Sequence, residues 1–211
     1  MMRTRVKFCG CTSWNDAVVA IETGADAIGM IFAPSPRRIA ESAARHIAEK
    51  LPPFITPVGV FVNPTREEVM RAREIFPDLV LQFSGEEAPS FLSSMDGKVI
   101  KALHVNPDAA DADSLARVAN EYPRAIAMFD TSVAGLAGGT GVAFPWKAVA
   151  SIARLRPIVV AGGLTPENVA ACVKAVRPFG VDVRSGIETD GRKDDKKMRA
   201  FVRAVRDADA A

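Results

Sequence analysis

Two side chains that can transfer protons stand at the ends of short apolar segments typical of β-strands. Cys9 is the last residue of RVKFC (5–9), and Asp130 is the last residue of AIAMFD (125–130). A thiol becomes a base when its pKa falls towards neutrality, and a carboxyl group becomes an acid when its pKa rises. Each residue also has a plain structural interpretation, as a small buried side chain or as a loop cap. Their shared position at strand ends favours proton transfer.

Glycine-rich segments follow three consecutive predicted strands. Glycine lets the backbone approach an anion closely, and the amides that begin a following helix supply donors and a favourable dipole. One such segment is often only a turn, whereas three in succession predict a phosphate site. The residues expected to contribute are Gly139, Gly162, Gly163, Ser185 and Gly186. The sequence has no G-x-x-x-x-G-K-[ST] motif, so a nucleotide-binding P-loop is not indicated.

These residues belong to a regular alternation of strands and helices. Short β-branched runs give way to longer segments with helical spacing, the pattern of repeated βαβ units. The predicted strands cover residues 5–9, 26–32, 56–62, 79–83, 98–105, 125–130, 158–163 and 181–186. Eight strands favour a closed (β/α)8 TIM barrel, an α/β fold, as a single domain over residues 1–211. Such barrels carry their active sites at the C-terminal ends of the strands.

Side-chain alternation predicts what the first strand presents to the barrel. Lys7 and Cys9 share one face, and Val6 and Phe8 share the other. The apolar pair should meet the helices, so we expect Lys7 and Cys9 to point into the barrel.

Local signals predict where several helices begin and end. Thr12, Thr65 and Thr165 are expected to cap three helix N-termini, and Gly24 is expected to end the first of these helices. The charged stretch GRKDDKKMR (191–199) is interpreted as the solvated start of a helix rather than as a binding patch.

The composition excludes several other classes of protein. The chain has 211 residues and a formal net charge of +2, which does not favour nucleic acid as a partner. Cys9 and Cys11 are too close together for a zinc pair, and the chain has two histidines, so we expect no metal and no cofactor. Three cysteines leave at least one unpaired, which fits a reducing compartment. No apolar run suits a signal core or a membrane span, so we expect a cytoplasmic protein.

A series of short motifs runs in order along nearly the whole chain. The motifs are KFCGCT (7–12), GADAIGMIF (24–32), SPR (35–37), GVFV (59–62), LQFSG (81–85), FD (129–130), GGTG (138–141), AGGLTPENV (161–169) and GVDVRSGIE (180–188). GGTG and AGGL are common among phosphate-binding barrels, whereas K-x-C-G together with SPR, FD and DVxSGIE is far more specific. The set resembles the phosphoribosylanthranilate isomerase family of tryptophan biosynthesis.

The resemblance implies an Amadori rearrangement of N-(5-phosphoribosyl)anthranilate to 1-(2-carboxyphenylamino)-1-deoxyribulose 5-phosphate. By position, Asp130 would be the general acid that protonates the furanose ring oxygen. Cys9 would be the general base that removes the C2′ proton. Lys7 has two open interpretations: it either lowers the pKa of Cys9 or pairs with an interior carboxylate.

The resemblance also implies contacts to the rest of the substrate. Arg37 matches the position that meets the anthranilate carboxylate, and it is preferred over the adjacent Arg38. Gln82 would lie near the substrate at the end of the fourth strand. Asp182 shares the inward face of the eighth strand and would bind a sugar hydroxyl or fix the loop.

Two positions depart from the family pattern. Ser84 stands where the family usually has histidine, which removes a contact to the aromatic end of the substrate. Arg184 stands where the family often has a small residue. Arg184 could pair with Asp182, reach the phosphate or turn outward at the rim.

Two other functions remain open on the sequence alone. One is an aminosugar isomerase of the histidine-pathway type, although that relative has an aspartate where this chain has Cys9. The other is a non-catalytic phosphate-binding barrel, although the set Cys9, Asp130 and Arg37 is intact. The expected partner is a small phosphorylated substrate, and the chain could be a monomer or a homodimer.

Overall fold

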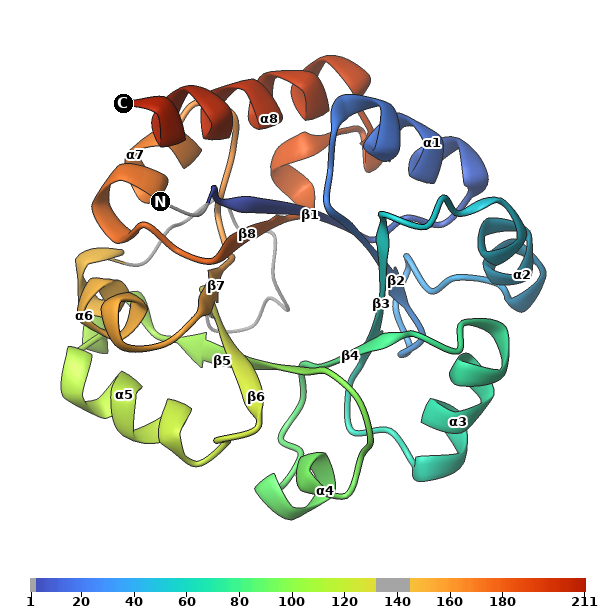
Figure 1. Ribbon diagram of the computed structural model, residues 1–211, viewed down its shortest axis with the longest axis horizontal. Helices are drawn as coiled ribbons and strands as arrows, with labels where there is room; N and C mark the ends of the chain where they lie inside the picture. Colours follow the sequence, from blue (N-terminus) through green and yellow to red (C-terminus); the bar gives the residue numbers. More distant parts are fainter. Residues whose placement is uncertain (1–2, 132–144) are drawn as a thin grey trace.

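The computed structural model describes residues 3–131 and 145–211, and in them eight parallel strands close into a barrel. Figure 1 looks down this barrel, with the strands as an inner ring and the helices outside it. The strands are β1 (Arg5–Cys9), β2 (Ala27–Ile31), β3 (Thr56–Phe61), β4 (Val80–Phe83), β5 (Val99–Val105), β6 (Ala125–Thr131), β7 (Ile158–Val160) and β8 (Gly180–Val183). Each one overlaps a predicted strand, and β1 pairs with β8 to close the ring. The predicted (β/α)8 barrel is confirmed.

Helices follow the strands and cover the outside of the ring. They are α1 (Trp14–Thr23), α2 (Glu41–Lys50), α3 (Arg66–Ile75), α4 (Pro89–Ser93), α5 (Ala112–Asn120), α6 (Lys147–Leu155), α7 (Val169–Val176) and α8 (Asp195–Ala210), with the 3-10 helices η1 (Pro107–Ala109) and η2 (Ser185–Ile187). Within the described residues, no helix combines the length and the apolar character that a membrane crossing needs.

The first helix begins one residue later than predicted. Its cap is Ser13, whose side chain accepts from the Asp16 amide while the Asp16 carboxylate accepts from the Ser13 amide. Thr12 instead donates to the Asp16 carboxylate, so the prediction that Thr12 is the cap is wrong. Gly24 ends α1 in the left-handed conformation, with φ 89°, as predicted.

The other two predicted caps have different outcomes. Thr65 caps α3 as predicted, in a reciprocal arrangement with Glu68. Thr165 does not cap α7, because residues 166–168 form a turn and the helix begins after Asn168. The Asn168 side chain spans this turn, accepting from the Thr165 amide and donating to the Gly163 carbonyl. The Asn168 side chain thus fixes the conformation of the segment after β7.

Apolar side chains form two separate layers. The outer layer lies between strands and helices and includes Val6 and Phe8. The inner layer lies inside the barrel as two clusters, one of Val58, Val80, Ile100, Ala102, Met128, Val159 and Ala161 and one of Cys9, Ile31, Ala33 and Val60. Since Val6 and Phe8 belong to the outer layer, Lys7 and Cys9 face the interior, as predicted.

A short hairpin separates β8 and η2 from the last helix. β9 (Glu188–Thr189) pairs with β10 (Arg192–Lys193) in antiparallel fashion. Between them Asp190 and Gly191 have φ 50° and 72°, the two positive values that a type I′ turn requires. Helix α8 starts only after this hairpin, and the Lys193 side chain is 5% exposed. The prediction of a helix start is therefore wrong for residues 191–193, and the prediction of solvation holds for Gly191 and Arg192 but not for the Lys193 side chain.

Candidate active site

Lys7 and Asp182 form an ion pair inside the barrel. Nζ of Lys7 lies 2.7 Å from Oδ1 of Asp182, and the two side chains are 7% and 9% exposed. Burial lowers the pKa of Lys7, but the negative charges of Asp182 and Cys9 outweigh it, so that pKa is raised. The structure therefore shows the contact expected if Lys7 is the partner of an interior carboxylate.

Cys9 lies beside this pair at the end of β1. It stands opposite Gly29 of β2, where an added Cβ would lie 2.9 Å from Lys7 Nζ and 3.1 Å from Cys9 Sγ. Glycine at this position therefore leaves the space that both side chains occupy. Burial raises the pKa of the Cys9 thiol, and the positive charge of Lys7 opposes this only in part. Lys7 alone does not make Cys9 a thiolate near neutral pH.

Asp130 approaches the same interior from β6. Burial first, and then the charge of Asp182, raise the pKa of the Asp130 carboxyl to about 6, against opposing contributions from His104, Arg184 and Lys7. A general acid needs a pKa raised in this direction. The structure thus brings Cys9, Lys7, Asp182 and Asp130 to one end of the barrel interior.

The predicted phosphate segments after β7 and β8 lie against each other. A Cβ at Gly186 would collide with the Leu164 carbonyl oxygen, so only glycine allows η2 to approach so closely. Gly162 has φ 80°, and a Cβ there would lie 2.7 Å from Asp130 Oδ1. Gly163 follows with φ 63°. Ser185 begins η2, and Gly139 lies outside the described residues.

Arg37 reaches the rim of the barrel from the loop after β2. Its amide donates to Ser35 Oγ, and its guanidinium binds Glu188 through Nε to Oε1 at 3.1 Å and Nη2 to Oε2 at 2.6 Å. Arg38 is exposed, and its backbone bridges to Ile31 instead. Of these two adjacent arginines, Arg37 is therefore the one that the structure brings to this end of the barrel.

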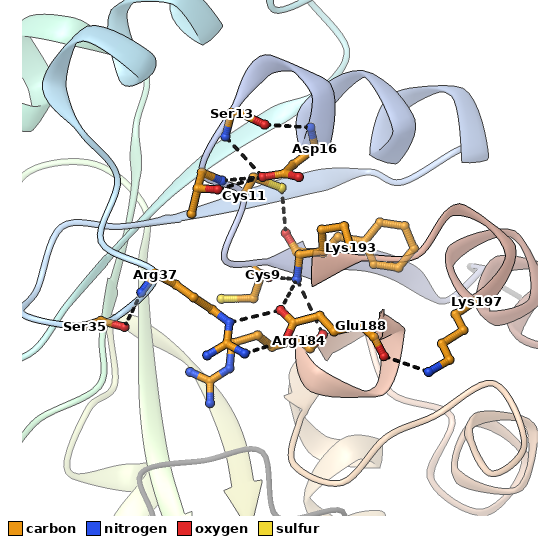
Figure 2. A network of polar contacts seen from close by, with 12 residues as sticks. Cys9, Cys11, Ser13, Asp16, Ser35, Arg37, Arg184, Glu188, Lys193 and Lys197 are labelled. Carbon is orange, nitrogen blue, oxygen red and sulfur yellow. Dashed lines mark hydrogen bonds and ion pairs between the residues drawn. The ribbon is translucent and has the colours of Figure 1, made fainter. Parts of the chain in front are cut away.

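Two charged residues at this end were missed from the sequence. Figure 2 shows Glu188 and Lys193 joined to Arg37 and to the backbone of Cys9 in one network. Lys193 Nζ lies 2.6 Å from the Cys9 carbonyl oxygen and 3.0 Å from Glu188 Oε1. The available signal was the Asp190–Gly191 pair, a strong hairpin marker inside the charged stretch.

The arrangement places a thiol, a carboxyl group with a raised pKa, glycine-rich segments and a guanidinium at one end of the barrel. In the part of the chain that the structure describes, no three His, Cys, Asp or Glu side chains are grouped to hold a metal ion.

Comparison with known proteins agrees with this geometry. A family model described as N-(5'phosphoribosyl)anthranilate (PRA) isomerase matches residues 6–204. The N-(5'-phosphoribosyl)anthranilate isomerase of Moorella thermoacetica is 45% identical over 208 residues, which are 97% of this chain and 91% of that protein. The relative from Desulforudis audaxviator is 44% identical over 97% of this chain and 99% of its own length. The chain belongs to the N-(5'-phosphoribosyl)anthranilate isomerase family.

Solved structures of the isomerase family have the same fold. The enzyme from Thermotoga maritima aligns with a TM-score of 0.86 at 35% identity, covering 97% of this chain and 99% of that one. Another structure, with a TM-score of 0.83 and 34% identity over the same shares, is a complex with reduced 1-(o-carboxyphenylamino)-1-deoxyribulose 5-phosphate. The family resemblance read from the sequence motifs is confirmed.

The first departure from the isomerase family pattern, Ser84, has a histidine beside it in space. His104 ends the inward face of β5, next to Asp130 in the β5–β6 register, and its Nε2 lies 3.0 Å from the Ser84 carbonyl oxygen. Sequence reasoning missed His104 because no motif marks the end of β5. Gln82 is buried nearby and donates to Ser84 Oγ, while its Oε1 has no partner among the described residues.

The second departure, Arg184, lies beside Arg37. A Cβ at Gly10 would meet the Arg37 side chain at 3.4 Å and the Arg184 side chain at 3.5 Å. The charge of Arg184 favours the ionised forms of both Cys9 and Asp130, since it lowers the pKa of each. These two effects oppose each other, because a lower pKa leaves more of Cys9 as thiolate and less of Asp130 protonated.

Proposed function

We propose that this chain catalyses the Amadori rearrangement of N-(5'-phosphoribosyl)anthranilate to 1-(2-carboxyphenylamino)-1-deoxyribulose 5-phosphate in tryptophan biosynthesis. The observation that carries the proposal is the placement of the buried Cys9 and the partly exposed Asp130 at one end of the barrel, with the Asp130 pKa raised to about 6. Family membership supports it.

Asp130 begins the reaction by protonating the furanose ring oxygen. The C1′–O bond then breaks, the anthranilate nitrogen supplies its electron pair to C1′, and a cationic iminium forms. Cys9 removes the C2′ proton, and the C2′–H electrons move to form an enolamine, which tautomerises to the ketone. No atom is gained or lost, so the step is an isomerisation without a cofactor.

The iminium explains how a thiol with a raised pKa acts as a base. In the protein alone, burial outweighs Lys7 and holds the pKa of Cys9 above its ordinary value. A positive charge that forms next to Cys9 during the reaction favours the thiolate when the C2′ proton has to be removed. Catalysis then depends on the substrate's own charge as well as on Lys7.

The two ends of the substrate bind on opposite sides of these groups. The backbone amides around Gly162, Gly163, Ser185 and Gly186, together with Gly139, bind the phosphate. Arg37 binds the anthranilate carboxylate. Gln82 Oε1, buried and without a described partner, accepts from the substrate, and Asp182 holds Lys7 while its second carboxylate oxygen accepts from a sugar hydroxyl.

The setting of the enzyme follows from the same residues. Cys9, Cys11 and Cys172 are free thiols, and a base at Cys9 requires a reduced thiol, so we propose a reducing compartment such as the cytoplasm. A Thermotoga maritima relative is described as dimeric and has been solved as monomers. We propose a monomer or homodimer in which residues 1–211 work as one domain.

A direct assay tests the proposal. Freshly generated phosphoribosylanthranilate is supplied, and loss of its anthranilate fluorescence is followed. Turnover by the parental protein is expected, with product identified by mass and retention. Folded protein without turnover would contradict the proposal.

A further inference from the structure

Glu188 and Lys193 form a buried charged pair that no step of the proposed reaction uses. They face each other across the β9–β10 hairpin, and each side chain is 5% exposed. Burying two charges is costly unless their hydrogen bonds are satisfied. The partners that satisfy them, Cys9 and Arg37, belong to the proposed catalytic and binding machinery.

Lys193 supplies a donor to the backbone of the catalytic strand. The β1–β8 ladder ends at the pair Phe8–Val183, one residue before Cys9. The Cys9 carbonyl thus lies past the last register pair, and Lys193 Nζ donates to it at 2.6 Å. An ammonium group takes the place that another backbone amide would have in a longer strand.

Glu188 fixes the orientation of Arg37 in the same way. Its two carboxylate oxygens accept from Nε and Nη2, which form one edge of the guanidinium. A second carboxylate would then bind through the Nη1–Nη2 edge. Glu188 also leaves Arg37 and Lys193 as two cations on one anion, so the cluster keeps a positive charge.

We propose that Glu188 and Lys193 are positioning residues that hold the Cys9 backbone and the Arg37 guanidinium in fixed relation to each other. The inference rests on the roles proposed above for Cys9 and Arg37. The proposed base and the proposed carboxylate-binding group are then both held by one hairpin (Figure 2). The hairpin would set the distance between Cys9 and Arg37 that the substrate has to bridge.

Replacing Lys193 and replacing Glu188 should change the kinetics in different ways. Lys193→Met should lower kcat by about 10- to 100-fold, since displacing a reacting group by about 1 Å costs on that order. The pH at which iodoacetamide alkylates Cys9 should rise, because the Lys193 charge lowers the Cys9 pKa. Glu188→Gln should mainly raise KM, by about tenfold, because Arg37 loses its ionic partner.

Lys197→Met is the matched control. Lys197 Nζ also donates to a backbone carbonyl, that of Glu188 at 2.7 Å, and so supports the same hairpin without contacting Cys9 or Arg37 in any described hydrogen bond. It should keep parental kcat, KM and alkylation profile. A general structural role for the hairpin would instead give the three variants the same kinetic change.

A fourth variant serves as the control for a loss of folding. If Lys193→Met does not fold, Glu188→Gln/Lys193→Met removes both charges and leaves no unpaired buried ion. In the double variant, kcat should fall and KM should rise. Folded variants with parental kcat, KM and Cys9 alkylation would overturn the inference.

Cys9→Ser and Arg37→Gln separate this inference from the proposed function. If both retain parental activity, the proposed roles are wrong and the inference falls with them. If both are impaired while Lys193→Met and Glu188→Gln are parental, only the positioning inference is overturned.

Discussion

Two of the buried lysine–carboxylate pairs in the described part of the barrel have the same length and different surroundings. Lys7–Asp182 and Lys101–Glu87 both have Nζ–O distances of 2.7 Å, and all four side chains are less than a tenth exposed. Lys7 faces the interior. Lys101 shares the outer face of β5 with Val99 and Leu103, which belong to the outer apolar layer.

The surroundings decide what each pair does. Lys101 also donates to the Gly85 carbonyl, and Glu87 accepts from the Asn63 and Gly85 amides. The Tyr122 hydroxyl donates to the Glu87 carbonyl, so the loop after β4 is held by a pair whose partners are mainly backbone groups. Lys7 and Asp182 instead border Cys9 and Asp130 and shift their pKa values. The same kind of ion pair thus stabilises a loop in one place and borders the proposed proton-transfer groups in the other.

The largest effect should come from the groups beside the Lys7 pair. Cys9→Ser and Asp130→Asn should each lower kcat by about 10²–10⁴, the usual worth of a general acid or base. Cys172→Ser is the control for losing a thiol, because Cys172 is buried in α7 away from this end of the interior. Steady-state kinetics is the measurement, and a parental kcat in Cys9→Ser would contradict the proposed role of Cys9 as the base.

Breaking the Lys101 pair should cost stability rather than catalysis. Lys101→Met leaves Glu87 as an uncompensated buried charge, which should reduce the free energy of unfolding by about 3–5 kcal/mol. Urea unfolding measures the loss, and kcat per folded molecule should stay parental. If kcat fell without a change in stability, the two pairs would not differ as argued.

Breaking the Lys7 pair should affect catalysis more. Lys7 lowers the pKa of Cys9 and of Asp130, so Lys7→Met should raise both. The thiolate becomes scarcer, and kcat/KM should fall by about 10- to 100-fold, a factor of ten for each pKa unit. The pH dependence of Cys9 alkylation is the measurement; an unchanged profile would show that Lys7 does not tune the thiol.

The pH profile should show which pair borders the acid. In the proposed mechanism, the reactive form has Asp130 protonated and Cys9 ionised. Below about pH 6, Asp130 is already protonated and further acid only removes thiolate, so kcat/KM should fall. Above that pH the loss of protonated Asp130 offsets the gain of thiolate until Cys9 titrates. Asp130→Asn should lose the break near pH 6, whereas Lys101→Met should retain it.

The smallest effect should come from Arg184, at the rim beside Arg37. We expect Arg184→Ser to raise KM several-fold and leave kcat nearly unchanged, as for a group that binds substrate and transition state equally. Initial rates over a range of substrate concentrations separate the two constants. A loss confined to kcat would place Arg184 with the Lys7 pair instead.

Period and position predicted the barrel and the location of the proposed acid and base. Alternation in RVKFC placed Lys7 and Cys9 on the inner face, and strand ends placed Asp130 near them. The raised pKa of Asp130 was out of reach, because it comes from burial and from Asp182, which lies on another strand.

The contact of Lys193 with Cys9 was not predictable from local pattern, because the Asp190–Gly191 marker indicates a hairpin but not what that hairpin meets. Lys193 lies in a run of charges, and only the Asp190–Gly191 turn brings it under Cys9. His104 likewise meets Ser84 through strand pairing, with no sequence signal at its own position. Thr165 was mistaken for a cap because a turn fixed by Asn168 precedes the helix.

The contact of Gly186 with Leu164 has a consequence for inhibition. Because the segments after β7 and β8 touch without an intervening side chain, the phosphate site proposed there is one preassembled receptor rather than two independent loops. A receptor of this kind loses little conformational entropy when it is filled. Small phosphate esters that lack the anthranilate ring should therefore compete measurably with the substrate. Replacing Gly186 with a larger residue should abolish that competition.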